Sequence, residues 1–87
     1  MIEKDILISN PTGLHARPAS DFILEAKKYQ STVTIAKKGE PSVNGKSIMK
    51  ILSLGIVQGD SVHLCVNGPD EAKCFAAIEQ LLAKAKD

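Results

Sequence analysis

Residues 61–66 (Ser-Val-His-Leu-Cys-Val) form the most regular polar–apolar alternation in the chain. Val62, Leu64 and Val66 would all point to one side of an extended strand, because successive strand side chains face opposite ways. A strand that is apolar on one side and polar on the other is typical of an antiparallel sheet covered by helices on one face. The stretch therefore favours an antiparallel sheet within an α+β fold.

The pattern on both sides of this strand alternates between strand and helix periods. Further strands are predicted over residues 2–8, 32–36 and 42–44, and helices over about 16–28, 47–55 and 69–86. The resulting order is β-α-β-β-α-β-α. No linker or repeat interrupts it, so residues 1–87 are expected to form a single domain. The order of the strands within the sheet is not predicted.

Composition excludes several function classes. Eighty-seven residues with 44% hydrophobic side chains can bury one modest core. A formal charge of +1, one Tyr, two Phe and no Trp argue against nucleic-acid binding, which uses basic surfaces and stacking aromatic rings. No apolar run is long enough to span a membrane, and the first residues are acidic where a signal peptide would be basic. We therefore expect a cytoplasmic protein that does not insert into membranes.

The cysteines and glycines predict neither a metal nor a cofactor. Cys65 and Cys74 have a spacing that matches no zinc or redox motif, so both are expected to be packing residues. His63 and Cys65 share one face of a strand and could begin a metal site, but no further ligands are evident. The glycines fit neither a P-loop nor a dinucleotide-binding spacing.

Residues 13–19 (Gly-Leu-His-Ala-Arg-Pro-Ala) place His15 at the beginning of the first predicted helix. Free backbone N–H groups and the positive end of the helix dipole make such a terminus a site for anions. Arg17 adds a guanidinium that can bind two phosphoryl oxygens, and this positive charge favours the neutral, nucleophilic imidazole. The pattern predicts a histidine that accepts and releases phosphate. The alternative is that His15 is a simple cap or a solvated loop residue.

Residues 13–19 closely resemble the active-site motif of the HPr family, the histidine phosphocarriers of the bacterial phosphoenolpyruvate-dependent sugar phosphotransferase system. Residues 45–55 (GKSIMKILSLG) resemble the regulatory-serine region of that family. The resemblance implies an open-faced β-sandwich with four antiparallel strands and three helices on one face. It also implies that Nδ1 of His15 takes a phosphoryl group from enzyme I, that Arg17 stabilises it, and that enzyme IIA proteins receive it. The chain would be a stoichiometric carrier, a monomer, and not an enzyme that turns over alone.

The short middle helix is unusually apolar. Ile51 and Leu54 can supply the stripe that faces the core, since a surface helix needs one such stripe. The predicted docking patch then consists of Ile48, Met49 and Leu52, with Ser20 at its edge. By resemblance, this patch binds enzyme I and the enzyme IIA proteins. The alternative is that all these side chains pack into the core.

Ser47 precedes this helix and is expected to act as its N-cap, a role worth about 1 kcal/mol. By resemblance, Ser47 is also a regulatory phosphorylation site. The implied regulatory partners are an HPr kinase/phosphorylase and a catabolite-control transcription regulator. A phosphate there would place negative charge beside the docking patch and weaken partner binding without unfolding the helix.

Two other functions remain open. A nitrogen-branch or other regulatory member of the family would share the histidine chemistry with different donors and acceptors. A non-catalytic binding module would act through the docking patch alone, and His15 counts against it.

Overall fold

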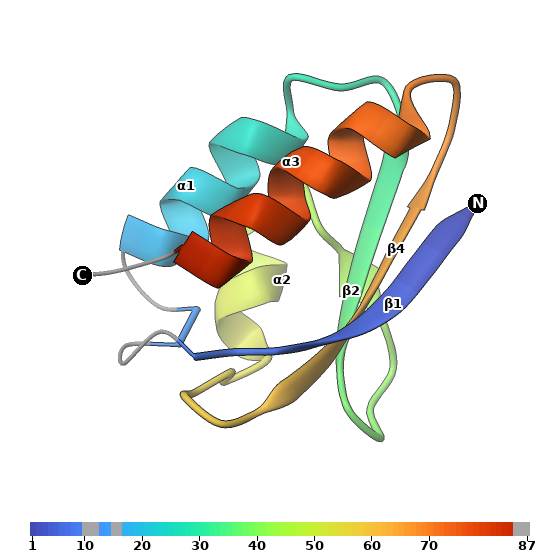
Figure 1. Ribbon diagram of the computed structural model, residues 1–87. Helices are drawn as coiled ribbons and strands as arrows, with labels where there is room; N and C mark the ends of the chain where they lie inside the picture. The colour runs from blue at the N-terminus through green and yellow to red at the C-terminus, as the bar shows by residue number, and fades with distance from the viewer. Residues whose placement is uncertain (10–12, 15–16, 85–87) are drawn as a thin grey trace.

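The computed structural model describes residues 1–9, 13–14 and 17–84, apart from the side chains of residues 17 and 84 (Figure 1). Its elements are β1 (Ile2–Leu7), α1 (Arg17–Ala26), β2 (Thr32–Lys37), β3 (Val43–Asn44), α2 (Ile48–Ser53), β4 (Ser61–Asn67) and α3 (Glu71–Lys84). The β-α-β-β-α-β-α order predicted from the sequence is confirmed.

The four strands form one antiparallel sheet in the order β1-β4-β2-β3. The central strand β4 pairs with β1 from Ile2↔Val66 to Leu7↔Ser61, and with β2 on its other side. All three helices lie on one face of this sheet, and the other face is open (Figure 1). The α+β fold with an open-faced sandwich is therefore confirmed.

Side chains of β4 alternate between the helices and the open face as the sequence predicts. Val62, Leu64 and Val66 are completely buried beneath the helices, while the residues between them are partly exposed. Strand β1 follows the same alternation, and its Lys4 stands on the helix-covered face. There the Lys4 ammonium lies 2.6 Å from the carboxylate of Glu79 on α3, so the charge that interrupts the apolar pattern is paired.

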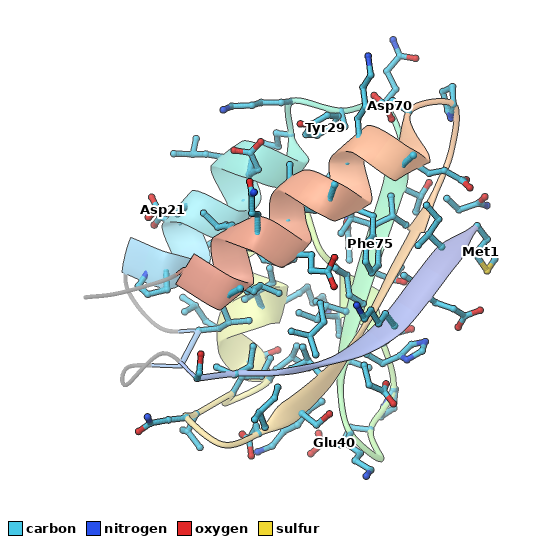
Figure 2. The ribbon with its side chains drawn as sticks, in the orientation of Figure 1. Met1, Asp21, Tyr29, Glu40, Asp70 and Phe75 are labelled. Carbon is cyan, nitrogen blue, oxygen red and sulfur yellow. The ribbon has the colours of Figure 1, made fainter. Side chains whose placement is uncertain are left out.

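The core lies between the sheet and the helix layer. Helix α1 buries Phe22 and Ala26, and helix α3 directs Phe75 toward the sheet (Figure 2). Ile51 of α2 is completely buried in the same cluster. Burial of these aromatic and branched side chains supplies the main favourable free energy for holding the helices against the sheet.

Helix α1 ends at Ala26, two residues before the predicted end at Lys28. The Lys28 N–H donates to the Glu25 carbonyl, three residues back rather than four, so the helix tightens into a turn. This turn carries the chain to residues 30 and 31, where the Asp70 carboxylate accepts hydrogen bonds. The helix thus ends just before the chain reaches this tertiary contact, which the local pattern does not encode.

Asp70, just before α3, connects the start of that helix to the segment that follows α1 (Figure 2). Its carboxylate accepts hydrogen bonds from the backbone N–H groups of Gln30 and Ser31, both at 3.0 Å, and from the hydroxyl of Ser31. The Ser31 hydroxyl, followed by the Gln30 amide, holds the pKa of the Asp70 carboxyl below its ordinary range. Ser31 is completely buried, so this cluster satisfies polar groups that have lost contact with water.

Candidate functional site

The residues directly before His15 are held by the loop that follows α2. The N–H of Leu14 donates to the carbonyl of Ile56 at 3.2 Å, and the Leu14 side chain is buried in the core. Gly13 has a φ of 65°, and a Cβ at this position would lie 2.3 Å from the Ile56 carbonyl oxygen. Only a glycine accommodates both the positive φ and this close approach. The chain is thus anchored immediately before His15.

Asp60 fixes the loop that provides this anchor. Its carboxylate accepts the Val57 N–H at 2.9 Å and lies 3.5 Å from the Lys37 ammonium. The hydrogen bond from Val57, with a smaller contribution from Lys37, lowers the pKa of the Asp60 carboxyl. The carboxylate therefore stays ionised at neutral pH and keeps the loop in place.

Helix α1 begins at Arg17, directly after the segment that contains His15. The first backbone N–H groups of an α-helix have no partner within the helix, and the first turn of α1 carries no acidic side chain to compete for an anion. Pro18 and Ala19 in this turn are buried, which seats the helix against the core. His15 itself and the side chain of Arg17 lie outside the described residues, so their predicted roles remain predictions.

The middle helix divides its side chains as the sequence predicts. Ile51 is completely buried and Leu54 is 9% exposed, whereas Met49 is 74% exposed. The large exposed apolar side chains of α2 are Ile48, Met49 and Leu52, the residues of the predicted docking patch. The alternative that all of them pack into the core is wrong. The predicted docking of partners there stays a prediction.

Val57, in the loop that follows α2, is a further exposed apolar residue that sequence reasoning missed. It is half exposed, and its Cα lies 2.7 Å from the Cβ that a side chain at Gly13 would have. The docking patch of α2 and the anchor next to His15 therefore meet at the same loop. Ser20 is exposed on α1, which packs against α2, and its place at the edge of the patch stays a prediction.

Ser47 occupies the N-cap position of α2 but does not cap the helix with its side chain. Its backbone is extended (φ −117°, ψ 115°), and its carbonyl accepts the Ile51 N–H at 3.1 Å. The hydroxyl makes no cap hydrogen bond, so the predicted side-chain cap is wrong. The preceding turn is held instead by the Asn44 side chain, which accepts the Lys46 N–H at 2.9 Å, so the segment does not depend on the serine hydroxyl.

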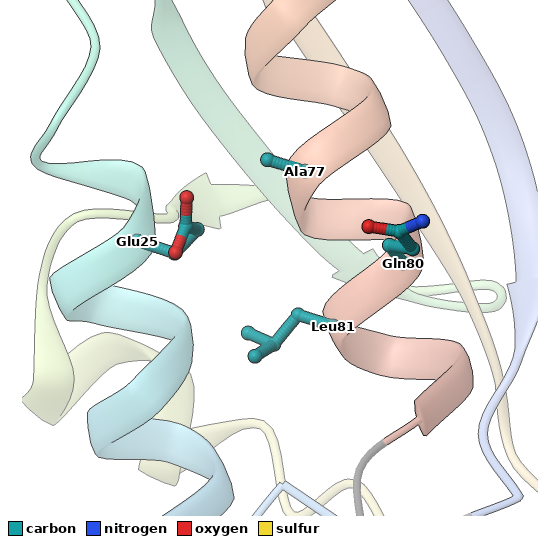
Figure 3. Close-up of a pocket in the computed structure, with 4 residues that line it drawn as sticks. All are labelled: Glu25, Ala77, Gln80 and Leu81. Atoms are coloured by element: carbon teal, nitrogen blue, oxygen red, sulfur yellow. The ribbon is translucent and has the colours of Figure 1, made fainter.

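A groove between α1 and α3 has no evident connection with these residues. Glu25, Ala77, Gln80 and Leu81 line it (Figure 3). The Glu25 carboxylate is already hydrogen-bonded to the ammonium of Lys28 at 3.2 Å and to the hydroxyl of Tyr29. The groove therefore offers no free charged group at its Glu25 side.

The remaining candidate ligands do not form a metal site in the described part of the chain. No three His, Cys, Asp or Glu side chains among residues 1–9, 13–14 and 17–84 converge on a common point. Cys65 and Cys74 are free thiols, Cys65 partly exposed and Cys74 buried. Within the same described residues, no helix has the length and apolar character needed to cross a membrane.

Comparison with known proteins identifies the family. The sequence pattern described as "PTS HPr component phosphorylation site" matches residues 2–84, nearly the whole chain. The chain belongs to the HPr family. It is 46% identical to the phosphocarrier protein HPr of Buchnera aphidicola over 81 residues, which cover 93% of this chain and 91% of that protein. It is 36% identical to the phosphocarrier protein HPr of Borreliella burgdorferi over the full length of both.

Solved HPr structures share the fold. HPr-C-His from Thermoanaerobacter tengcongensis superimposes with a TM-score of 0.91 at 44% identity, covering 95% of this chain and 92% of that one. A chain of the HPr dimer from the same organism, also 44% identical, superimposes with a TM-score of 0.75 over 95% of this chain and 94% of that one. Members of the HPr family thus occur as dimers in some structures. Like these relatives, the chain is an HPr phosphocarrier of the phosphotransferase system.

Proposed function

We propose that His15 accepts a phosphoryl group from phosphorylated enzyme I and passes it to sugar-specific enzyme IIA proteins. The match of a phosphorylation-site family over residues 2–84 is the observation that carries this proposal. The motif at residues 13–19 supplies the histidine and the arginine that the chemistry needs. The protein would act once per phosphoryl group, as a carrier and not as an enzyme that turns over alone.

In the proposed transfer, a neutral ring nitrogen of His15, Nδ1 by resemblance to the family, attacks the phosphorus in line. The new P–N bond forms as the bond between phosphorus and the donor breaks, and the same exchange in the opposite sense delivers the group to the acceptor. Positioning and charge stabilisation dominate catalysis of phosphoryl transfer. Arg17 and the N–H groups of the first turn of α1 would bind the equatorial oxygens.

The docking patch, Ile48, Met49 and Leu52, would bind both the donor and the acceptors. Exposed apolar side chains gain free energy when a partner covers them. Met49 is the most exposed of the three, and its flexible thioether can adapt to partners of different shape. The loop contact between Gly13 and Ile56 supports the proposal, because it joins the region of α2 to the segment that contains His15.

Phosphorylation of Ser47 would regulate this docking. The Ser47 hydroxyl makes no cap hydrogen bond, its residue is partly exposed, and it directly precedes the patch. A phosphate carries nearly two negative charges at neutral pH, and an apolar partner surface would have to desolvate them. An HPr kinase/phosphorylase would add the group, and a catabolite-control transcription regulator would read it. A monomer in the cytoplasm fits this exchange between several partners.

The intact mass of the protein after incubation with phosphoenolpyruvate and a purified general enzyme I tests the proposal. One acid-labile phosphoryl group on the parent and none on His15→Ala would establish the carrier and its site. No modification, with the donor shown active on another HPr, would favour a nitrogen-branch member, which a nitrogen-branch enzyme I would then phosphorylate. Failure with both donors would leave the non-catalytic binding module as the better account.

A further inference from the structure

The open face of the sheet carries a histidine held between two carboxylates. Nδ1 of His63 lies 2.8 Å from Oδ1 of Asp5, and Nε2 lies 2.7 Å from Oε1 of Glu3. Asp5 is directly opposite His63 in the pairing of β1 with β4, and Glu3 is opposite the next residue on that face, Cys65. Each ring nitrogen therefore has a carboxylate of its own, and both carboxylates come from the edge strand.

The two contacts require a protonated ring. An ionised carboxylate only accepts hydrogen bonds, and a neutral imidazole has a single N–H to donate. Both hydrogen bonds can form together only when His63 carries a proton on each nitrogen and a positive charge. The hydrogen bond to Asp5, followed by that to Glu3, accordingly raises the pKa of His63 above its ordinary value, against the partial burial that lowers it.

The other groups around His63 offer no competing partner of this kind. On its own strand the titratable neighbour on the same face is Cys65, two residues away. On the β2 side His63 pairs with Ala36, and the charged residue next in the same alternation is Lys38. The carboxylates flank opposite sides of the ring, so they do not converge on one point as metal ligands would.

Strand β1 is the edge strand that these carboxylates belong to, and it pairs with β4 alone in the described sheet. On the helix-covered face its Lys4 pairs with Glu79, and the terminal ammonium of Met1 lies 2.8 Å from Glu71. On the open face the described cross-strand charge contacts of β1 are the two to His63. Loss of the proton on His63 would therefore weaken the attachment of β1 from one face only.

We propose that Glu3, His63 and Asp5 form a pH-sensitive clasp that fastens the edge strand β1 to β4. The folded state binds the His63 proton more tightly than the unfolded chain does. The clasp therefore contributes its full stabilisation below the ordinary histidine pKa of about 6.5, and loses it as the pH rises through the higher value of the folded protein. Strand β1 opens more readily on the alkaline side of neutrality.

The clasp is exposed to solvent, which limits its strength. The side chains of His63, Glu3 and Asp5 are 42%, 53% and 70% exposed, so water and salt screen the charges. Exposed ion pairs change an equilibrium only modestly, and two of them should shift the opening of β1 by roughly threefold to tenfold. Added salt should reduce this shift.

Nitrogen-detected NMR of the imidazole rings in the unmodified protein gives the first test. Both nitrogens of His63 should be protonated below about pH 6.5, and the ring should titrate above this value. The double variant Glu3→Gln/Asp5→Asn should return its titration to the ordinary range, whereas His15 should be unaffected and serves as the internal reference. A His63 ring that titrates at or below about 6.5, or that titrates identically in the double variant, would overturn the proposal.

Amide hydrogen exchange across β1 gives the second test, with rates corrected for the intrinsic effect of pH. Opening of β1 should increase between about pH 6.5 and pH 9 in the parent and in Glu71→Gln, where the Met1 amine has lost its partner, and adding His63→Gln to Glu71→Gln should remove this increase. Glu71→Gln and Glu79→Gln are the matched controls, because they remove the partners of the Met1 amine and of Lys4 and should leave the effect of His63 in place. Protection of β1 that is independent of pH in the parent would also contradict the clasp.

Discussion

Contacts with a carboxylate hold the molecule at both ends of β2, with Asp70 where β2 begins and Asp60 where it ends, but the second end also presents apolar side chains of α2 to solvent. At the first end Asp70 satisfies the N–H groups of residues 30 and 31. At the second end Lys37 reaches the carbonyl of Gly55, and the nearby α2 exposes Met49. The first end satisfies its polar groups internally and offers a partner little. The second end also leaves the apolar side chains of α2 exposed, so both ends contribute to stability and the second end alone carries the proposed docking patch.

The largest effect is expected at Gly13, where the second end depends on a close backbone contact. Gly13→Ala should lower the free energy of unfolding by roughly 3 to 5 kcal/mol, because the alanine would have to keep a positive φ and its Cβ would have to displace the Ile56 carbonyl. Urea denaturation measures this loss. Gly55→Ala is the control: Gly55 has a φ of 64° with no atom within 4 Å of its Cβ position, so its cost should be roughly 1 to 2 kcal/mol. Equal losses would show that the close contact is unimportant.

Ile51 and Met49, on opposite faces of α2, separate packing from binding at the second end. Ile51→Ala should cost about 2 to 4 kcal/mol of stability, since it removes a completely buried side chain. Met49→Ala should change stability by less than about 0.5 kcal/mol, as expected for an exposed side chain, and should raise the KM of enzyme I for the protein. Thermal unfolding and phosphotransfer kinetics provide the two readouts. A Met49→Ala protein with a weakened fold and unchanged partner affinity would show that Met49 serves packing rather than binding.

Ser31 tests the first end. Ser31→Ala should lower the free energy of unfolding by about 1 to 2 kcal/mol, since it removes the buried hydroxyl that donates a hydrogen bond to the Asp70 carboxylate. Folding lowers the pKa of the Asp70 carboxyl, so the ionised carboxylate stabilises the folded state. This stabilisation is complete above the ordinary carboxyl pKa of about 3.9 and is lost as the pH falls through the lower pKa of the folded protein. The difference between parent and variant should therefore be constant near neutrality and shrink in acid. A difference that instead grows in acid would mean that Asp70 is not ionised in this cluster.

The smallest effect is expected at Ser47. Because its hydroxyl makes no cap hydrogen bond, Ser47→Ala should change stability by less than about 0.5 kcal/mol. Guanidinium denaturation at neutral pH is precise enough when the parent is measured in parallel. A loss near 1 kcal/mol would indicate that the hydroxyl does cap α2 in solution, and that its phosphorylation would have to break this bond first.

Sequence periodicity predicted the elements and their faces because both depend on neighbours along the chain. The alternation of residues 61–66 and the apolar stripe that begins at Ala19 each correspond to one buried face in the structure. The same reasoning placed Ile51 inward and Met49 outward on α2. The family motif at residues 13–19 predicts a site at His15, and of its neighbours Leu14 is held by the Ile56 contact and Arg17 begins α1.

The features that were missed all require knowledge of which distant segments meet. The clasp on the open face depends on Asp5 being opposite His63, a register that no local pattern contains. The segment that follows α1 is hydrogen-bonded to Asp70, about forty residues further along the chain, and the exposed Val57 lies in the loop that approaches Gly13. Acidic residues at alternate positions of β1 were the available signal for the clasp, since they share a face with His63 once the strands are paired.

The position of β4 at the centre of the sheet has a consequence for how the protein is made. Ile2 pairs with Val66, so β1 has no partner in the sheet until the much later β4 has left the ribosome. Until then, the described sheet could contain only the short pairing of β2 with β3. Pairing between such distant segments is slow, because closing a long loop costs chain entropy before any favourable contact between the strands forms. Folding of the sheet should therefore wait until β4 has been made, and β1 remains open to chaperones until β4 covers it.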